Sequence, residues 1–264
     1  MELLILKPTA MKELKLLLAL CSLLIFGPLT AQLTVNAGND TVICSNQPVQ
    51  LGGTPIVTGG TGPYTYIWSN GATTTNQIVN PVGTVSYTLT VTDMVGATGV
   101  DVVIITVSSP TVSTQVTDVL CNGGNNGIAC AHASDGLSPY TYIWSNGMAN
   151  DSCIQGLSAG TYVVTAIDNI GCTAEASFTV FQPNPIQTSF SVTNVTCYGL
   201  NNGSIDMTVT GGTNPYTYIW FPIAATTEDI VGLAAGDYYS IVTDANGCQK
   251  YDTLVITEPT QIQA

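Results

Sequence analysis

The sequence predicts an all-β protein built from tandem β-sandwich modules. The hexapeptide "PYTYIW" occurs three times, beginning at Pro63, Pro139 and Pro215, so that successive copies lie 76 residues apart. Self-similarity at a fixed period is typical of a repeat architecture. The chain is rich in Thr, Val, Tyr, Gly and Asn, which favour strands and turns, and it shows no helical periodicity.

The N-terminus predicts a signal peptide over residues 1–31. From Met11 the chain has two lysines, an apolar run at 16–26, a Gly-Pro break and then Ala31, after which we expect cleavage. Either Met1 or Met11 is compatible with the start of translation. The apolar run is shorter than the ~20 residues of a membrane-spanning helix. We therefore expect an exported chain with no membrane insertion after cleavage.

The charge of the mature chain excludes two classes of partner. The sequence has 17 acidic and 4 basic residues, and residues 1–31 contain two of the acidic and three of the basic ones, which leaves 15 acidic residues against Lys250. Proteins that bind nucleic acid rely on Lys and Arg to neutralise phosphates. Basic residues also attach proteins to anionic membranes. We expect neither partner.

The repeat divides the mature chain into modules at 32–108, 109–183 and 184–259, and 260–264 reads as the start of a further copy. The second and third copies align without a gap from Cys121 and Cys197 onwards. The first copy is a more divergent relative, because its other motifs need small shifts in the alignment.

Alternation along the strands predicts which residues face the core. The segment "SIDMTVT" at 204–210 alternates apolar and polar residues, which is typical of a half-buried strand. In "YTYIW" we expect the Tyr and Trp residues to point inward and the Ile to point outward. These isoleucines, one in each module, form a candidate contact row for neighbouring stalks or for a surface: Ile67, Ile143 and Ile219.

The motifs "LSAGTY" and "LAAGDY" resemble the tyrosine corner of immunoglobulin-like sandwiches, in which a Tyr hydroxyl bonds back to the preceding turn. We expect about seven short strands in each copy. The predicted fold is thus a series of tandem immunoglobulin-like β-sandwich modules that form an elongated rod.

The segments "CYGLNNGSIDMTVTGGTNPYTYIW" and "GLAAGDYYSIVTDANGC" resemble the SprB repeat, a family named after a surface adhesin of gliding Bacteroidetes. The first copy, with "NAGNDTVIC" and "NPVGTVSYTLTVTD", resembles the PKD-like domains that accompany such repeats. The resemblance implies an extracellular protein of the bacterial cell surface, delivered by type IX secretion and connected with gliding motility. It implies an adhesin or stalk whose surface polymer or protein partner is unknown.

A second reading of the aromatic residues is open at this point. The Tyr and Trp residues of each hexapeptide could form the platform of a carbohydrate-binding module in a secreted protein that acts on polysaccharides. Burial decides between the two readings, because a platform must be exposed.

Seven cysteines remain after signal cleavage, and an exported protein favours disulfides between them. Pairing within copies joins Cys121 to Cys172 and Cys197 to Cys248, and this scheme does not include Cys44. Pairing between copies joins Cys44 to Cys172 and Cys121 to Cys248, and this scheme does not include Cys197. Both schemes are open.

The second copy has an additional cysteine pair, Cys130 and Cys153, where the third copy has Asp206 and Asp229. Its predicted second strand also carries Ala129, Ala131 and Ala133 in place of larger apolar residues. We expect a Cys130–Cys153 bridge that offsets part of a poorer core.

No residue pattern predicts catalysis, and we expect a protein that is not an enzyme and needs no cofactor. His132 has no nucleophile or orienting carboxylate in a second motif. Glu228 and Asp229 read as a solvated acidic edge. Asp93, Asp168 and Asp244 precede hairpins and read as turn formers. Calcium at module junctions is compatible with the oxygen ligands available, but no Asp-x-Asp-x-Asp loop is present.

Overall fold

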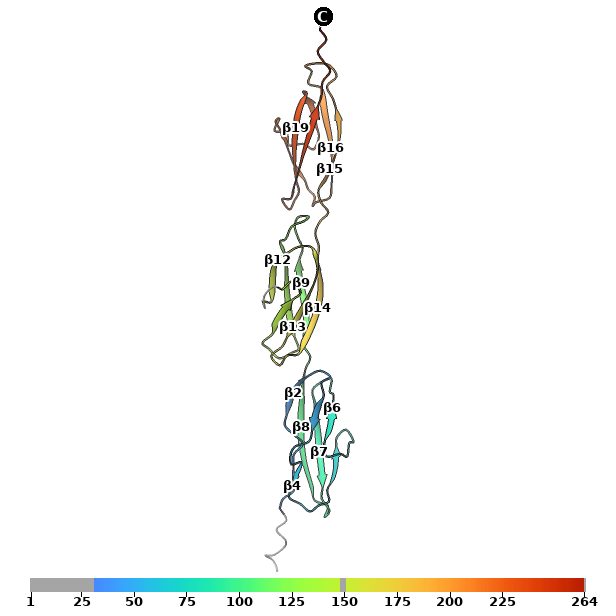
Figure 1. Cartoon of the computed structure of the whole chain (residues 1–264), viewed down its shortest axis with the longest axis vertical. Helices are drawn as coiled ribbons and strands as arrows, with labels where there is room; N and C mark the ends of the chain where they lie inside the picture. Colours follow the sequence, from blue (N-terminus) through green and yellow to red (C-terminus); the bar gives the residue numbers. More distant parts are fainter. Residues whose placement is uncertain (1–30, 148–150, 264) are drawn as a thin grey trace, which may run out of the picture. The chain divides into compact units, whose positions relative to one another are not determined.

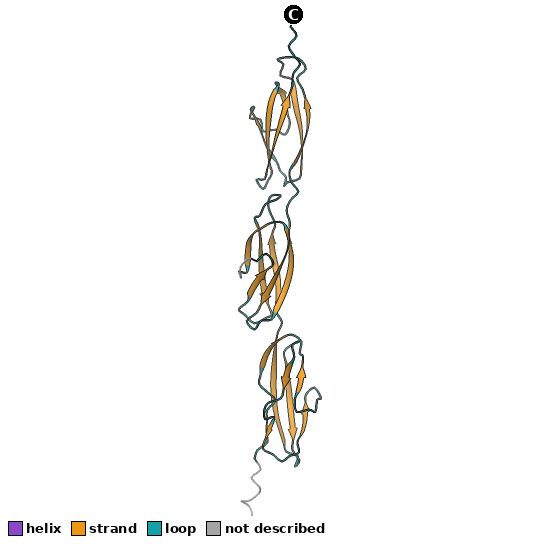
Figure 2. Ribbon diagram, viewed as in Figure 1, coloured by secondary structure: helices purple, strands orange, loops and turns teal. Residues whose placement is uncertain are grey.

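The computed structural model describes residues 31–147 and 151–263. Apart from Ala31, the predicted signal peptide lies outside this part of the chain. The described residues form strands and loops only (Figure 2). Within them there is accordingly no helix of the length and apolarity that crossing a membrane requires. The predicted all-β class is confirmed.

The chain separates into two compact units, Met1–Ser108 and Ser109–Ala264. The first unit holds a four-stranded sheet of order β2-β8-β7-β5 and two two-stranded ribbons, β3-β6 and β1-β4 (Figure 1). Strand β2 runs parallel to β8. The strands are β1 (Thr34–Val35), β2 (Thr41–Cys44), β3 (Val49–Leu51), β4 (Val57–Thr58), β5 (Thr65–Trp68), β6 (Gln77–Val79), β7 (Val85–Thr92) and β8 (Thr98–Ser108).

The second unit contains two modules, and each consists of two three-stranded antiparallel sheets. The sheet orders are β12-β10-β9 and β11-β13-β14 in the second module, and β15-β16-β18 and β17-β19-β20 in the third. The second module's strands are β9 (Thr111–Thr117), β10 (Gly127–Ser134), β11 (Thr141–Trp144), β12 (Cys153–Leu157), β13 (Gly160–Ile167) and β14 (Thr173–Val180). The third module's strands are β15 (Gln187–Thr193), β16 (Gly203–Thr210), β17 (Thr217–Phe221), β18 (Ile230–Leu233), β19 (Gly236–Thr243) and β20 (Gln249–Ile256).

The strand count differs from the expected number of about seven in each copy. Among the described residues, the second and third modules have six strands each, and the first unit has eight. In the third module the connection 222–229 leads directly from β17 in one sheet to β18 in the other. The connection pairs with β17 only through an isolated bridge between Ala225 and Trp220, so it does not form a further strand. The expected rod concerns how the modules are placed relative to one another and stays a prediction.

Each module has its own core between its sheets. In the third module the alternating residues Ile205 and Met207 of β16 face Trp220 and Val242 of the opposite sheet, and all four are buried. The tyrosine corner is present, because the hydroxyls of Tyr162 and Tyr238 donate to the carbonyls of Ser158 and Ala234, at 2.9 and 3.1 Å. The immunoglobulin-like character predicted from these motifs is confirmed.

Candidate functional site

The repeated hexapeptide builds the interior of each module. Trp68, Trp144 and Trp220 are 1%, 2% and 0% exposed. Each indole Nε1 donates to a backbone carbonyl further along the chain, at Thr74, Asp151 and Thr227. The first Tyr of each copy donates its hydroxyl to the carbonyl of an earlier turn, at Gly59, Gly136 and Gly211. Core packing and the closure of two loops therefore explain why the motif recurs.

This burial removes the aromatic platform of the carbohydrate-binding alternative. The Trp residues have no free ring face, and Tyr142 is buried as well. The remaining Tyr residues of the three motifs are half-buried and pack against the cores. A sugar ring needs an exposed aromatic face to stack on, so that reading loses its residues.

The isoleucine of each motif faces outward. Ile67, Ile143 and Ile219 are 55%, 54% and 43% exposed. Side chains alternate across a strand, so the burial of the neighbouring Trp residue forces this orientation. The structure thus leaves all three members of the candidate contact row accessible.

In the third module the outward Ile belongs to a larger apolar surface. Cross-strand pairing sets Ile219 beside Ile241 and Ile241 beside Tyr251. The next pair along the strands sets Phe221 beside Tyr239. We call this surface the third-module face, and it consists of Ile219, Phe221, Tyr239, Ile241, Tyr251 and Val255, of which all but Ile241 are exposed.

The same face of the second module is mostly polar. Its residues at the corresponding positions are Ile143, Ser145, Val163, Thr165, Glu175 and Thr179. The common fold therefore does not require an apolar surface here. Isolated exposed apolar residues are ordinary, but a contiguous apolar patch marks an interaction surface.

A buried aspartate organises the last hairpin of every module. Asp93, Asp168 and Asp244 are nearly inaccessible. One carboxylate oxygen accepts two N–H groups from the hairpin, and the other accepts one N–H from the loop before the hexapeptide, at Thr61, Leu137 or Thr213. Burial alone would raise the pKa of Asp93, but the backbone N–H donors, led by Thr61, hold it below its ordinary value.

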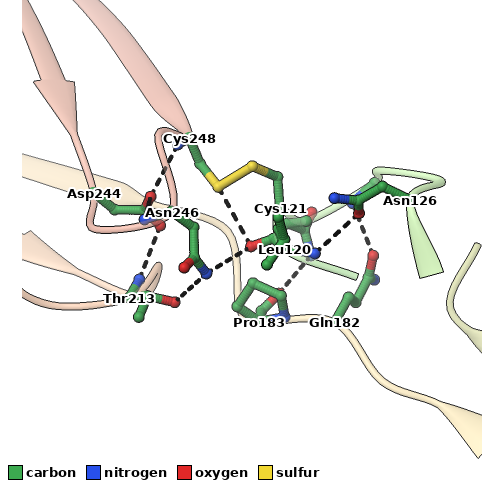
Figure 3. The surroundings of a disulfide bond; sticks show 11 residues. Leu120, Cys121, Asn126, Gln182, Pro183, Thr213, Asp244, Asn246 and Cys248 are labelled. Carbon is green, nitrogen blue, oxygen red and sulfur yellow. Dashed lines mark hydrogen bonds between the residues drawn. A yellow bond between two sulfur atoms is a disulfide. The ribbon is translucent and has the colours of Figure 1, made fainter. Parts of the chain in front are cut away.

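The hairpin of the third module is fastened to the first loop of the second module. Cys121 and Cys248 form a disulfide with an S–S distance of 2.06 Å and a Cα–Cα distance of 5.6 Å (Figure 3). The Asn246 side-chain amide, at the tip of the same hairpin, donates to the Leu120 carbonyl at 3.0 Å and to the Thr213 hydroxyl at 3.0 Å. A covalent bond and a hydrogen bond thus join the two modules at this point.

This disulfide contradicts the scheme that pairs cysteines within copies. Cys248 immediately precedes β20, whereas the Val195 N–H bonds to the Thr257 carbonyl just beyond the other end of β20. Strand β20 has eight residues and is therefore roughly 27 Å long at ~3.4 Å per residue. Cys197, two residues after Val195, is therefore too far from Cys248, because disulfides need Cα atoms within about 7 Å.

The other cysteines complete this account. Cys197 is exposed and carries a free thiol. The remaining between-copy pair, Cys44 with Cys172, stays a prediction. Cys130 and Cys153 are joined, as their shared replacement by Asp in the third copy suggested, and they are register partners on β10 and β12. The bridge lies on the side of β10 that also presents the exposed His132.

The groups weighed for catalysis or metal binding are not assembled into a site. Within residues 31–147 and 151–263, no three His, Cys, Asp or Glu side chains are placed to hold a metal ion. Glu228 and Asp229 lie near the half-buried Tyr218, where burial, followed by the charge of Glu228, raises the Tyr218 pKa. Asp229 itself accepts a hydrogen bond from the Met207 N–H at 2.9 Å and so serves the backbone.

A model of the SprB repeat matches residues 56–73, 113–149 and 189–225. Three segments of the chain thus match the SprB repeat. The matched segments in the second and third modules include the hexapeptide strands β11 and β17 and the strands β10 and β16 that precede them. The shorter match at 56–73 shows that the first module shares this motif as well, while its likeness to PKD-like domains stays a prediction. These repeats support a general role as a cell-surface repeat protein.

Several solved structures are similar to this chain, and one of them consists of tandem immunoglobulin domains. The eight N-terminal domains of Down syndrome cell adhesion molecule align with 88% of this chain at 12% identity and a TM-score of 0.43, and the chain spans 37% of that structure. A fragment of a 1.5-MDa bacterial ice-binding adhesin gives 17% identity over 88% of this chain and 98% of its own, with a TM-score of 0.39. The I9–I11 tandem of titin gives 12% identity, 87% and 98% coverage, and a TM-score of 0.33. No curated protein matches this chain.

Two features of the second and third modules were not expected from the sequence. The aspartates were predicted to form turns. Their hydrogen bonds to a second loop require the hexapeptide strand to be paired with the strand that precedes the aspartate, as β17 is paired with β19 in the third module. The third-module face was also missed, because its residues come from three strands. An alignment of the outward positions of the two SprB repeats would have revealed the contrast between Glu175 and Tyr251.

Proposed function

We propose that this chain is part of an exported cell-surface adhesin, in which the SprB repeats form a stalk and the third module makes an adhesive contact. The observation that carries the proposal is the third-module face. Its exposed Phe221, Tyr239 and Tyr251 replace Ser145, Val163 and Glu175 of the second module. Large aromatic side chains dominate the energetics of protein contacts.

The charge of the chain narrows the choice of partner. The mature sequence has 15 acidic residues and a single basic one, so an acidic surface is repelled. The six residues of the third-module face carry no charge, and the exposed Asp237, which is the register partner of Val255 on the same side of the sheet, adds a negative charge at its edge. We therefore infer that it contacts an uncharged or basic surface, and that a second copy of this acidic chain is disfavoured at low ionic strength.

The experiment replaces three residues of the third-module face by the residues found at the same positions of the second module. The variant Phe221→Ser, Tyr239→Val, Tyr251→Glu copies the second module and should fold. Beads coated with residues 32–264 are flowed over uncharged, basic and acidic surfaces, and the retained fraction is counted. We expect retention on the first two surfaces to fall roughly tenfold, which corresponds to about 1.4 kcal/mol.

Two controls separate the face from the contact row. The variant Ile67→Thr, Ile143→Thr removes the two members of the predicted row that lie outside the third-module face, and should leave retention unchanged if the face alone makes the contact. Val163→Ser, on the second module, should leave retention unchanged. If the folded face variant adheres as well as the parent chain, the proposed adhesive role of the third module is wrong.

Surface display, delivery by type IX secretion and a part in gliding follow from the resemblance to SprB and belong to the same proposal. Antibodies against residues 184–259 should label intact cells and should fail to do so in cells that lack this secretion route. Loss of the gene should reduce attachment or gliding. Labelling that requires cell lysis would contradict this part of the proposal.

A further inference from the structure

The third module repeats, at its far end, the loop that receives a hairpin in the second module. In the second module the N–H groups of Val119, Leu120 and Gly123 bond to Phe181, Asn126 and Gln182. The corresponding N–H groups of the third module bond to the corresponding acceptors, namely Val195 to Thr257, Thr196 to Asn202 and Gly199 to Glu258, at 3.1, 3.2 and 2.7 Å. The two loops are therefore held in the same way.

Only one of these two equivalent loops is occupied in the structure. Cys121 is bonded to Cys248, whereas its counterpart Cys197 has an exposed free thiol. The acceptor for Asn246 in the occupied loop is the backbone carbonyl of Leu120. The third module offers the same backbone group at Thr196, so this recognition does not depend on the side chain at that position.

Two substitutions make the unoccupied loop more apolar than its occupied counterpart. Tyr198 and Leu200 stand where the second module has Asn122 and Gly124. Both side chains are about half exposed, at 54% and 46%. Apolar side chains gathered around a free thiol are expected where a further protein surface covers them.

The segment that follows the third module carries an independent indication. After the second module, Ile186 packs against the core of the third. Its counterpart after the third module, Ile262, is 93% exposed. Ile262 thus has the position of a core residue for a module joined to the third in the way that the third is joined to the second.

We propose that the end of the third module formed by Cys197, Tyr198, Leu200 and Ile262 is a docking site for the cysteine hairpin of a further SprB repeat joined in the same chain. The hairpin it takes has the form of "DANGC", with an Asn or similar residue at its tip and a cysteine after the Gly. The bond that forms is a disulfide between Cys197 and that cysteine. This proposal depends on the repeat geometry and not on the adhesive third-module face.

The chemistry requires a two-electron oxidant, which a small disulfide such as oxidised glutathione supplies. The Cys197 thiolate attacks one sulfur of the oxidant and releases one thiolate of glutathione. The hairpin cysteine, as its thiolate, then attacks Cys197 Sγ and releases the second. Two protein thiols are oxidised, and one molecule of oxidised glutathione is reduced to two of reduced glutathione.

The test extends the chain by one repeat. Residues 32–259 are followed by a second copy of 184–264, in which Cys197→Ser removes the duplicate free thiol and Lys250→Arg marks the duplicate hairpin by mass. After refolding with oxidised glutathione, unreduced protein is alkylated and mapped by mass spectrometry. We expect Cys197 to be alkylated in the parent chain, and in the extended chain to be joined to the marked hairpin with Cys121–Cys248 unchanged.

A matched variant and a second extension keep the result decisive. Replacing the cysteine of the marked hairpin by Ser should restore alkylation of Cys197. A second chain appends residues 108–183 instead, whose hairpin carries Cys172. The proposal is overturned if Cys197 remains alkylated in both extended chains. It is also overturned if Cys197 pairs with the original, unmarked Cys248 or with Cys197 of another molecule.

Discussion

The second and third modules share the same strand order and motifs, but different residues pack in their cores. In the second, Trp144 meets the edge of Phe178 on β14, with ring centroids 5.8 Å apart, and β10 contributes only alanines. In the third, Trp220 meets the edge of Phe190 on β15 at 6.5 Å, and β16 contributes Ile205 and Met207. The aromatic partner thus comes from the Trp residue's own sheet in the second module and from the opposite sheet in the third.

The comparison shows that one set of residues specifies the strand pairing and another set specifies the packing of the core. The hexapeptide, the buried hairpin aspartate and the tyrosine corner recur at the same positions and set the strand pairing. The interior volume between the sheets is supplied by whichever strand carries large residues. The second module is therefore not simply a weakened copy, because Phe178, stacked on Tyr162, fills space that the alanines leave.

The largest test of this comparison removes the two aromatic partners. Phe178→Ala should destabilise the second module by about 3–5 kcal/mol, because Phe178 is buried beside small neighbours that cannot fill the cavity. Phe190→Ala should cost the third module less, because Phe190 is half-buried. Hydrogen exchange followed by mass spectrometry measures each module in the intact chain. Equal losses in the two modules would contradict the proposed difference in filling.

The second test removes the bridge that only the second module has. Cys130→Ser with Cys153→Ser should lower the stability of this module by ~2–4 kcal/mol. Exchange should accelerate in β10 and β12 and stay unchanged in β16 and β18. Asp206→Ser, at the corresponding position of the third module, is the matched control and should have little effect. Free thiols at both positions in the exported protein would show that the bridge is not used.

The third test concerns the tips of the two hairpins. Asn246 of the third module stands where the second module has Ile170. Asn246→Ile removes the hydrogen bond to the Leu120 carbonyl, and the net loss should be about 0.5–1.5 kcal/mol. Hydrogen exchange in the Cys121 loop should become faster, while the disulfide persists. An unchanged exchange rate would mean that the disulfide alone holds this loop.

The smallest expected effect is a difference in acid sensitivity. Asp135 of the second module corresponds to Gly211 of the third, and both have a positive φ. Hydrogen bonds from the hydroxyls of Thr111 and Ser134 lower the Asp135 pKa. Because the folded pKa lies below the ordinary value of about 3.9, the stabilisation is complete above that value and is lost as the pH falls through the folded pKa.

Asp135→Asn should abolish this component of the acid sensitivity. Exchange in β9 and β10 would be measured from neutral pH down to below the ordinary Asp value, with the parent chain for comparison. The third module, with Gly211, supplies an internal reference in the same sample. An Asn variant with an unchanged pH profile would show that other carboxylates account for the acid response.

The period of 76 residues, the all-β class and the inward and outward faces of the hexapeptide were all predictable from the sequence. These features depend on local order: strand alternation places Trp220 inside and Ile219 outside whatever the neighbouring strands do. The tyrosine corner and the turn-forming aspartates were recognisable for the same reason, since their partners lie within a few residues. The Cys130–Cys153 bridge could be anticipated because the two residues are replaced together.

Only the tertiary structure decided between the two cysteine schemes and revealed the third-module face. The pairing of Cys121 with Cys248 depends on β20 holding Cys248 at the opposite end of the module from Cys197. The third-module face depends on the register that sets Ile219, Ile241 and Tyr251 side by side from three strands. Distances across a sheet are set by strand pairing and not by separation along the chain, so neither result could follow from the order of the residues alone.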